Sequence, residues 1–272
     1  MNTKKGLIIL AGLFLFMLIT TACAGLPKEQ ITLLLNQANE DFRQANSLPA
    51  GTEQVGKLYE SAILIYEKII SQGRIENAKL YYNLANAYFL KGDIGRAVVN
   101  YRRAAKLDSS DENVQKNLSF ARSRRIDKVN VQTEKRVLQT LFFWHYDFSI
   151  KTKFLLSCIF FAIVCISLTV KTLLCRSTTA TATAVICGIL TVCFASSAAL
   201  EASKQANTVC GVITAQEVFA RQGDGQNYPP SFKDPLHCGT EFDLVEQRPG
   251  WLHIKLSDNS DGWIPETTAD LI

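Results

Sequence analysis

The sequence predicts a multi-domain membrane protein with an all-α helical module, two transmembrane helices and a C-terminal all-β barrel. Three observations support this fold class. Apolar residues recur at helical spacing over 28–123, two long uncharged segments follow, and residues 209–272 alternate apolar and polar residues in short runs. The chain has 272 residues and a net charge of +4, so each soluble module is small.

The first 24 residues have the three-part layout of an export signal. A short basic start is followed by an apolar stretch over 7–19 and then by small residues. Cys23 is a lipidation candidate, because the surrounding residues resemble a bacterial lipoprotein signal, although Thr20 stands where that signal usually has Leu. Cleavage after Ala24 and retention as an uncleaved anchor are the alternatives. All three place the following residues outside the cytoplasm.

The segment from Asn77 to Asp111 has the clearest helical pattern in the chain. Two stretches with apolar and small residues at helical spacing are separated by Lys91-Gly92-Asp93. The segment resembles a tetratricopeptide repeat, a helical hairpin of roughly 34 residues. The matching large, small and turn residues are Tyr81, Leu84, Ala85, Tyr88, Gly92, Ala97, Tyr101 and Ala104. Ser109 stands where Pro is usual in the repeat.

A degenerate repeat precedes this segment, and a short apolar stripe follows it. The pattern predicts the two helices of this earlier repeat at residues 33–46 and 56–73. Val114, Leu118 and Ala121 form the later stripe, which we expect to cap the stack because the last repeat cannot bury its final face alone.

The resemblance to tetratricopeptide repeats implies a peptide-binding concave face formed by the first helix of each repeat. It maps that face onto Tyr82, Asn86, Phe89 and Leu90. The amide of Asn86 can pair with a peptide backbone, and the aromatic rings can hold apolar side chains. The alternative is that Phe89 and Leu90 are buried against the preceding hairpin.

A basic and aromatic linker over 124–152 leads into a membrane hairpin with helices at 153–174 and 179–200. Each arm is long enough for the roughly 30 Å hydrocarbon layer, and two crossings return the chain to the side that it left. We therefore expect residues before and after the hairpin to face one compartment. Lys171 and Arg176 favour a cytoplasmic turn, whereas Lys151 and Lys153 argue the other way. Because the export signal precedes the helical module, we expect the residues on both sides of the hairpin to lie outside the cytoplasm.

Residues 209–272 resemble a bacterial SH3-like barrel. The motifs follow the order usual in that fold: glycines at turns, then Gly250-Trp251, then Gly262-Trp263-Ile264-Pro265. The resemblance implies a shallow aromatic groove for a Pro-rich or glycan partner, formed by Tyr228, Trp251, Trp263 and Pro265. The alternative is that these side chains serve packing alone.

Cysteine usage and motif spacing indicate no catalytic or metal chemistry. Cys210 and Cys238 are the two cysteines of the C-terminal module, and export would allow them to form a disulfide. The sequence has no Cys/His spacing suited to zinc, no phosphate-binding glycine loop and no paired nucleophile and base. It therefore predicts neither an enzyme nor a cofactor. The basic linker favours lipid headgroups over nucleic acid.

The order of segments, with the repeat in NLANAYFLKGDIGRAVVNYRRAAKLDSSDENVQKNL, resembles the BatE-type proteins of the bacterial Bat aerotolerance operons. This resemblance implies a non-catalytic partner of other membrane or envelope proteins, including von Willebrand-type Bat proteins, in the bacterial inner membrane. The function expected is a membrane-anchored adaptor linked to oxidative-stress tolerance. The alternative is an anchor that binds peptidoglycan through the SH3-like module.

Overall fold

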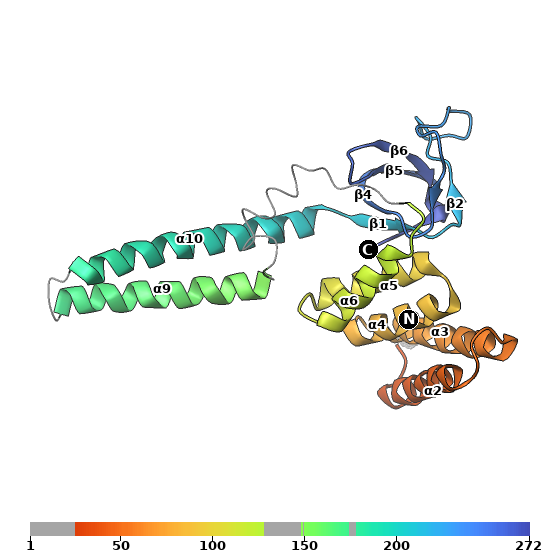
Figure 1. The fold of residues 1–272 in the computed structure, drawn as a ribbon, viewed down its shortest axis with the longest axis horizontal. Helices are drawn as coiled ribbons and strands as arrows, with labels where there is room; N and C mark the ends of the chain where they lie inside the picture. Colours follow the sequence, from red (N-terminus) through yellow and green to blue (C-terminus); the bar gives the residue numbers. More distant parts are fainter. Residues whose placement is uncertain (1–24, 128–147, 149, 174–177) are drawn as a thin grey trace, which may run out of the picture. The chain divides into compact units, whose positions relative to one another are not determined.

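The structure is a computed structural model that describes residues 25–127, 148, 150–173 and 178–272 (Figure 1). The predicted signal with Cys23, most of the linker and the turn of the hairpin with Arg176 lie outside the described residues. The chain divides into two compact units, one up to Asp93 and one from Ile94 onward.

The first unit contains three helices, α2 (Lys28–Ser47), α3 (Glu53–Gly73) and α4 (Ala78–Lys91). α2 and α3 form an antiparallel pair, and α4 packs against α3. Small side chains at the contacts are almost fully buried, which lets the helix backbones approach closely; they are Ala38, Ala45, Ala62 and Ala85. This is the pairing expected for the degenerate repeat and the first helix of the clear one.

The second unit begins with α5 (Ile94–Leu107) and α6 (Glu112–Ser123), which pack together. The carboxylate of Asp111 caps α6 by accepting hydrogen bonds from Asn113 N at 2.8 Å and Val114 N at 3.4 Å. α6 buries the predicted stripe of Val114, Leu118 and Ala121.

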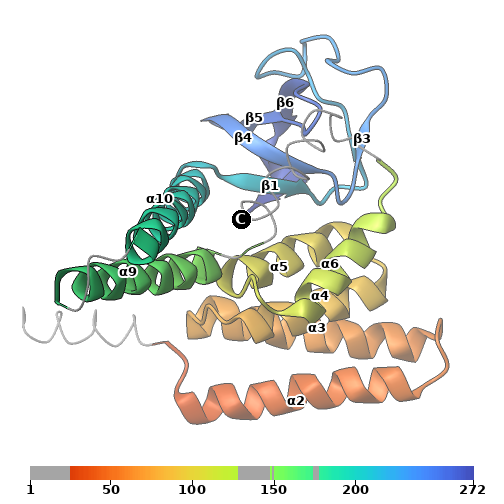
Figure 2. The same cartoon turned by 60° about the vertical axis from the view of Figure 1, so that its left-hand side comes forward.

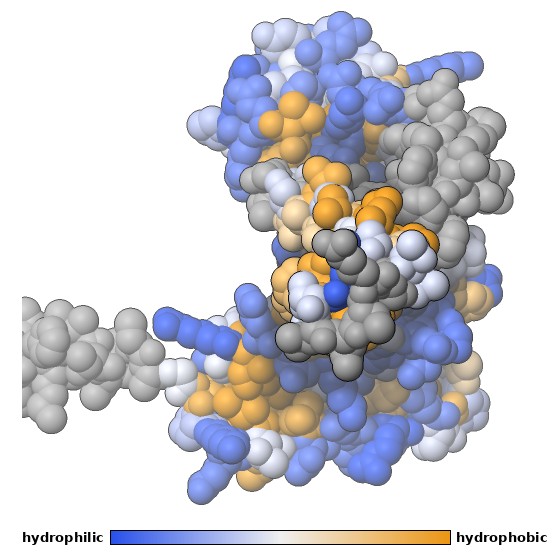
Figure 3. All heavy atoms as spheres, turned by 90° about the vertical axis from the view of Figure 1, so that its left-hand side faces the viewer, coloured by the Kyte–Doolittle hydropathy of each residue, from blue (hydrophilic) through white to orange (hydrophobic). Residues whose placement is uncertain are grey.

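A hairpin of two apolar helices follows, α9 (Ile150–Leu173) and α10 (Thr178–Asn207). Both are long and apolar enough to cross a membrane, over Ile150–Thr172 and Thr178–Ser203. Figure 3 views the two helices end-on and shows hydrophobic residues among those that face the reader. α10 continues seven residues beyond the predicted end at residue 200, because ALEASKQAN consists largely of good helix formers.

The two helices of the hairpin meet along a narrow seam. The buried positions of α10 are Ala184, Cys187, Phe194, Ser197 and Ala198, close to the 3.5-residue repeat of a coiled coil. Phe160 of α9 stacks on Phe194 with ring centroids 5.9 Å apart, and Ser157 Oγ donates to Thr191 O at 3.3 Å. Small and polar side chains therefore hold the seam, as is usual between helices in lipid.

A buried ion pair joins the two helices at the open end of the hairpin. The ammonium of Lys153 on α9 contacts the carboxylate of Glu201 on α10, and the Lys153 side chain is fully buried. A charge removed from water is costly unless it is paired, so this contact favours the register in which the two residues meet.

The C-terminal module is an antiparallel sheet. Its strands are β1 (Cys210–Ile213), β2 (Glu217–Val218), β3 (Leu236–His237), β4 (Glu241–Arg248), β5 (Trp251–Lys255), β6 (Asp261–Pro265) and β7 (Ala269–Leu271). Five strands lie in the order β6-β5-β4-β1-β7, and β2 pairs with β3. The five-stranded sheet is not closed, since β6 and β7 are its two edges.

The core of the sheet lies on one face. Leu252, Ile254 and Ile264 are 0 % exposed, as the alternating pattern of β5 predicts. Gly211 of β1 lies opposite Phe242 of β4, and a Cβ at this glycine would come 2.3 Å from the Phe242 ring. Glycine is therefore required there for the ring to fill the core.

The sheet follows the hairpin with almost no intervening chain. α10 ends at Asn207 and β1 begins at Cys210, so Thr208 and Val209 form the whole connection (Figure 1). The start of the sheet is therefore close to the end of α10.

The glycine at the end of α4 offers a test of whether local backbone conformation determines where this helix ends. Gly92 has φ +94°, a left-handed conformation that costs a residue with Cβ about 1 kcal/mol. Gly92→Ala should therefore lower the unfolding temperature of the detergent-solubilised protein, followed by helical circular dichroism. Gly56→Ala is the matched control: Gly56 lies within α3 with nothing within 4 Å of its Cβ position, so this variant should gain about 0.5–1 kcal/mol. Equal stability of Gly92→Ala and the parent would contradict this account of the helix end.

Candidate functional site

α4, the first helix of the clear repeat, is fixed at both ends by local hydrogen bonds. The Asn77 side chain accepts from Lys79 N at 2.9 Å and Leu80 N at 3.2 Å. At the other end Gly92 N donates to Phe89 O at 3.0 Å, and Asp93 N donates to Tyr88 O at 2.9 Å. These contacts define where the helix begins and ends and so which side chains share a face.

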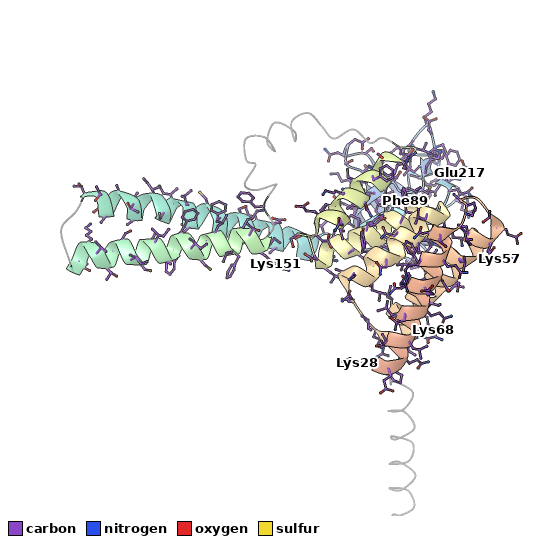
Figure 4. All side chains as sticks on the ribbon, turned by 60° about the horizontal axis from the view of Figure 1, so that its bottom comes forward. Lys28, Lys57, Lys68, Phe89, Lys151 and Glu217 are labelled. Carbon is purple, nitrogen blue, oxygen red and sulfur yellow. The ribbon has the colours of Figure 1, made fainter. Side chains whose placement is uncertain are left out.

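The residues predicted for peptide binding lie on one side of α4. Tyr82, Asn86, Phe89 and Leu90 are separated by three, four or one residues, which places them along one helical face. Tyr82, Asn86 and Phe89 are half-buried, and Leu90 is 48 % exposed. Leu90 is therefore not buried against the preceding hairpin. Figure 4 labels Phe89 on this helix.

A polar network links α4 to the two preceding helices, and sequence reasoning missed it. Asn39 Oδ1 on α2 accepts from the Tyr66 hydroxyl on α3 at 2.7 Å and from Asn83 Nδ2 on α4 at 3.5 Å. Burial, together with the charge of Asp41, raises the pKa of Tyr66 to about 12, so its hydroxyl remains a donor. The network fixes the orientation of the Asn39 amide, and it adds Asn39 and Asn83 to the residues beside the predicted face.

In the sheet, the residues predicted for an aromatic groove share one face of β5 and β6. Trp251 pairs with Pro265, and His253 pairs with Trp263, so all four point away from the core residues Leu252 and Ile254. Trp263 is only 7 % exposed, because the His253 ring stacks on it at 4.7 Å and the Arg248 guanidinium lies 4.6 Å from its ring centre. Trp263 therefore serves packing, while Trp251 remains partly accessible.

Tyr228, the fourth predicted groove residue, is brought to the same region by Arg221. The Arg221 backbone exchanges two 2.8 Å hydrogen bonds with Trp263, and its Nη1 donates to Tyr228 O at 3.0 Å. The Tyr228 ring covers Gly223, where a Cβ would come within 2.8 Å of it. Tyr228 is 48 % exposed.

Cys210 and Cys238 do not form a disulfide in this structure. Cys210 lies opposite Asp243 of β4, and its thiol is 3.4 Å from Asp243 Oδ1. A disulfide requires Cα atoms about 4.4–6.8 Å apart, and both residues are thiols in this structure. Within the described ranges no group of three His, Cys, Asp or Glu side chains could hold a metal ion.

The sheet of the second unit docks on α5. Gly95 lies against the end of β1, where a Cβ would come 2.9 Å from Ile213 O and 3.1 Å from Thr214 Cα (Figure 2). Further along the same side of α5, Arg103 Nη2 donates to Leu271 O at 2.9 Å and Lys106 Nζ donates to Ile272 O at 3.2 Å. A small residue at one end and two cations at the other thus join the helix to β1 and β7.

Glu241, the first residue of β4, is surrounded by three arginines. Arg122 Nε and Nη2 donate to its two carboxylate oxygens at 2.7 Å each, Arg125 Nη1 donates at 3.1 Å, and Arg102 lies 3.6 Å away. Burial would raise the pKa of Glu241, but the hydrogen bonds and charge of Arg122, with the charges of Arg102 and Arg125, hold that pKa below its ordinary value. The bidentate geometry makes this the strongest polar contact of the docked face.

A second carboxylate fixes the chain just after α6. Asp127 Oδ2 accepts from His237 N at 2.6 Å and from Thr240 Oγ1 at 2.7 Å, and Oδ1 faces His237 Nδ1 at 2.7 Å. Burial would raise the pKa of Asp127, but these hydrogen bonds outweigh it and lower that pKa. The start of the linker is thereby attached to β3.

These docking residues could not be recognised as a group from the sequence. Arg122 and Glu241 are separated by 119 positions in the sequence. The run of basic residues around Arg122 is also typical of a solvated linker. The one local signal was Gly95 within a helical pattern, since a glycine there costs about 1 kcal/mol and needs a packing reason.

Comparison with known proteins identifies one segment of the chain. The family model for the tetratricopeptide repeat matches residues 78–111, which covers α4 and α5. No curated protein matches the chain. The predicted repeat is thus confirmed at the position where its signature residues were found.

Removal of the Glu241 charge should loosen the docked sheet. Glu241→Gln leaves three guanidinium groups without their shared carboxylate, and breaking a buried pair of this kind costs about 2–4 kcal/mol. We expect faster hydrogen exchange in β1 and α6 and a lower denaturant midpoint. Glu246→Gln is the control, since the partly exposed Glu246–Arg248 pair should contribute little. Matching exchange rates in the two variants would contradict the role given to Glu241.

Acid should also weaken the docking. Glu241 and Asp127 both have folded-state pKa values below their unfolded values, which are about 4.3 and 3.9. Their stabilisation is therefore complete above those unfolded values and is lost as the pH falls through the folded ones. The exchange of β1 amides, corrected for intrinsic rates, should rise below about pH 4. Asp127→Asn should show a shallower pH dependence, and an unchanged slope would contradict the assignment.

Proposed function

We propose that this protein is a non-catalytic adaptor that is held at a membrane by the α9–α10 hairpin and binds a partner protein through α4. The observation that carries the proposal is the tetratricopeptide match, since such repeats form interaction surfaces, and its first helix places Tyr82, Asn86, Phe89 and Leu90 on one face. The bound element is an extended peptide or an amphipathic helix that offers apolar anchors and a backbone for amide pairing.

The docked sheet supports a shared side for the soluble parts. α5 and α6 precede the hairpin and the sheet follows it, yet Glu241 and Asp127 join them directly. These contacts support a hairpin whose two ends emerge on one face of the bilayer. Lys153, which argued for a cytoplasmic location, is neutralised by Glu201. The side proposed is the extracytoplasmic face of the bacterial inner membrane.

Two finer assignments belong to this proposal. The strand order and the aromatic face of β5 and β6 support an SH3-like reading of the C-terminal module, in which Tyr228, Trp251 and Pro265 offer a second binding surface. The segment order supports a place in a Bat-type complex with von Willebrand-type proteins and a link to oxidative-stress tolerance. The second candidate function, an anchor to peptidoglycan, is favoured by the exposure of Tyr228.

The α4 face is tested by the double variant Tyr82→Ala with Asn86→Ala. We expect co-purification of crosslinked partners from membranes to fall several-fold, because both an apolar anchor and an amide pair are lost. Leu64→Ala with Lys68→Ala on the exposed side of α3 is the matched control (Figure 4). If the α4 variant captures partners as well as the control does, the face has no part in binding.

The same preparations separate the two candidate functions. Trp251→Ala with Tyr228→Ala changes the sheet surface and leaves α4 intact. Loss of sedimentation with isolated cell wall in this variant alone would favour the peptidoglycan anchor. Retention on the wall, together with loss of partners in the α4 variant, would favour the adaptor.

A further inference from the structure

The end of α5 is connected by hydrogen bonds, through the last residue of the sheet, to the strand that follows α10. Lys106 Nζ bonds Ile272 O at 3.2 Å, and Ile272 N bonds Cys210 O at 2.9 Å. Cys210 is three residues beyond the end of α10, a chain length of at most about 10 Å. Arg102 also lies close enough to Cys210 to oppose the rise in the pKa of its thiol that burial causes.

Asp108, which follows the last residue of α5, is influenced by a charge at the start of the other arm. Hydrogen bonds from Ser110 are the main reason that the pKa of Asp108 is lowered, and the ammonium of Lys151 adds to the effect. Lys151 is the second residue of α9 (Figure 4). Lys153, two residues further on, pairs with Glu201 of α10, so Lys151 lies at the same end of the hairpin as the connection to β1.

The depth of this site follows from the length of α10. The apolar span ends at Ser203 and the helix continues to Asn207, a rise of about 6 Å. The headgroup layer on each side of a bilayer is about 5–8 Å thick. The end of α10 therefore lies within the headgroup layer, and the end of α5 is joined to the residues that follow it through Ile272 and Cys210.

The side chains at this level suit an anionic lipid surface. Lys106 and Lys151 are exposed cations, and Lys106 uses one of its three donors on Ile272. Leu107 is 40 % exposed and Val209 is 43 % exposed, so apolar groups lie beside the charges. Two acidic residues lie near them: Asp108, whose charge is opposed by Lys151, and Asp243, which lies opposite Cys210.

We infer that Lys106, Leu107, Lys151 and Val209 form a membrane-facing surface that binds the headgroups of anionic phospholipids. The two cations attract the phosphates, each by about 1 kcal/mol, or about fivefold in affinity. The two apolar side chains enter the boundary below the headgroups. This inference rests on the hairpin crossing a bilayer, as in the proposed function.

The test uses the full chain in nanodiscs with a benzophenone amino acid at one position and lipid adducts measured by mass spectrometry. In discs that contain phosphatidylglycerol, a probe replacing Leu107 should form adducts several-fold faster than one replacing Phe219. Phe219 is the matched control because it is 44 % exposed and follows β2, which lies beyond the far end of β1 from α10 (Figure 1). Lys106→Gln should lower the Leu107 adduct rate about fivefold. Discs of phosphatidylcholine alone should lower it further, because neither Lys106 nor Lys151 then meets an anionic headgroup.

A third probe, replacing Ile189 on the exposed face of α10, separates this inference from the proposal on which it rests. Adducts at Ile189 but equal rates at Leu107 and Phe219 would overturn the membrane-facing surface and leave the hairpin intact. No adduct at Ile189 would overturn both. A Leu107 rate that is the same with and without phosphatidylglycerol would overturn the preference for anionic lipid.

Discussion

The contact between Glu241 and Arg102, Arg122 and Arg125 is the interaction on which the second unit depends. The Glu241 carboxylate at the start of β4 contacts the guanidinium groups of Arg102 on α5, Arg122 on α6 and Arg125 just after α6. Without it, the helices before the hairpin and the sheet after it would keep the Asp127 contacts and the hydrogen bonds from Arg103 and Lys106, but would lose their only bidentate ion pair among the described residues. Because a buried charge needs its partners, the pair selects one docked arrangement over others.

α5 belongs to the tetratricopeptide repeat and also packs against the C-terminal sheet, and it uses different side chains for the two roles. Ala97, Tyr101 and Ala104 are the buried signature positions of the repeat, whereas Gly95, Arg103 and Lys106 lie on the side that meets the sheet. Since 3.6 residues make one turn, the two sets occupy different faces of the same helix. The predicted binding residues are all on α4, so docking of the sheet uses other side chains than those proposed for the partner.

Local chemistry made much of the fold predictable. The turn at Gly92, the apolar lengths of the two long helices and the alternation of Leu252 and Ile254 each follow from a few neighbouring residues. The four residues predicted for peptide binding fall on one helical face for the same reason. Asn39, Asn83, Asp127 and Glu241 could not be found in this way, because their roles depend on partners 44 to 119 positions away. Likewise, both sequence readings of Trp263 were open until the positions of His253 and Arg248 were known.

The two-residue connection between α10 and β1 has a mechanical consequence. Thr208 and Val209 are the only residues between the helix and the sheet, so the connection can absorb little movement. A tilt of the hairpin, caused by bilayer thickness or lateral tension, would therefore turn the sheet with it. Since the sheet is fastened to α5 and α6, strain in the lipid would be transmitted to the end of the repeat as a torque.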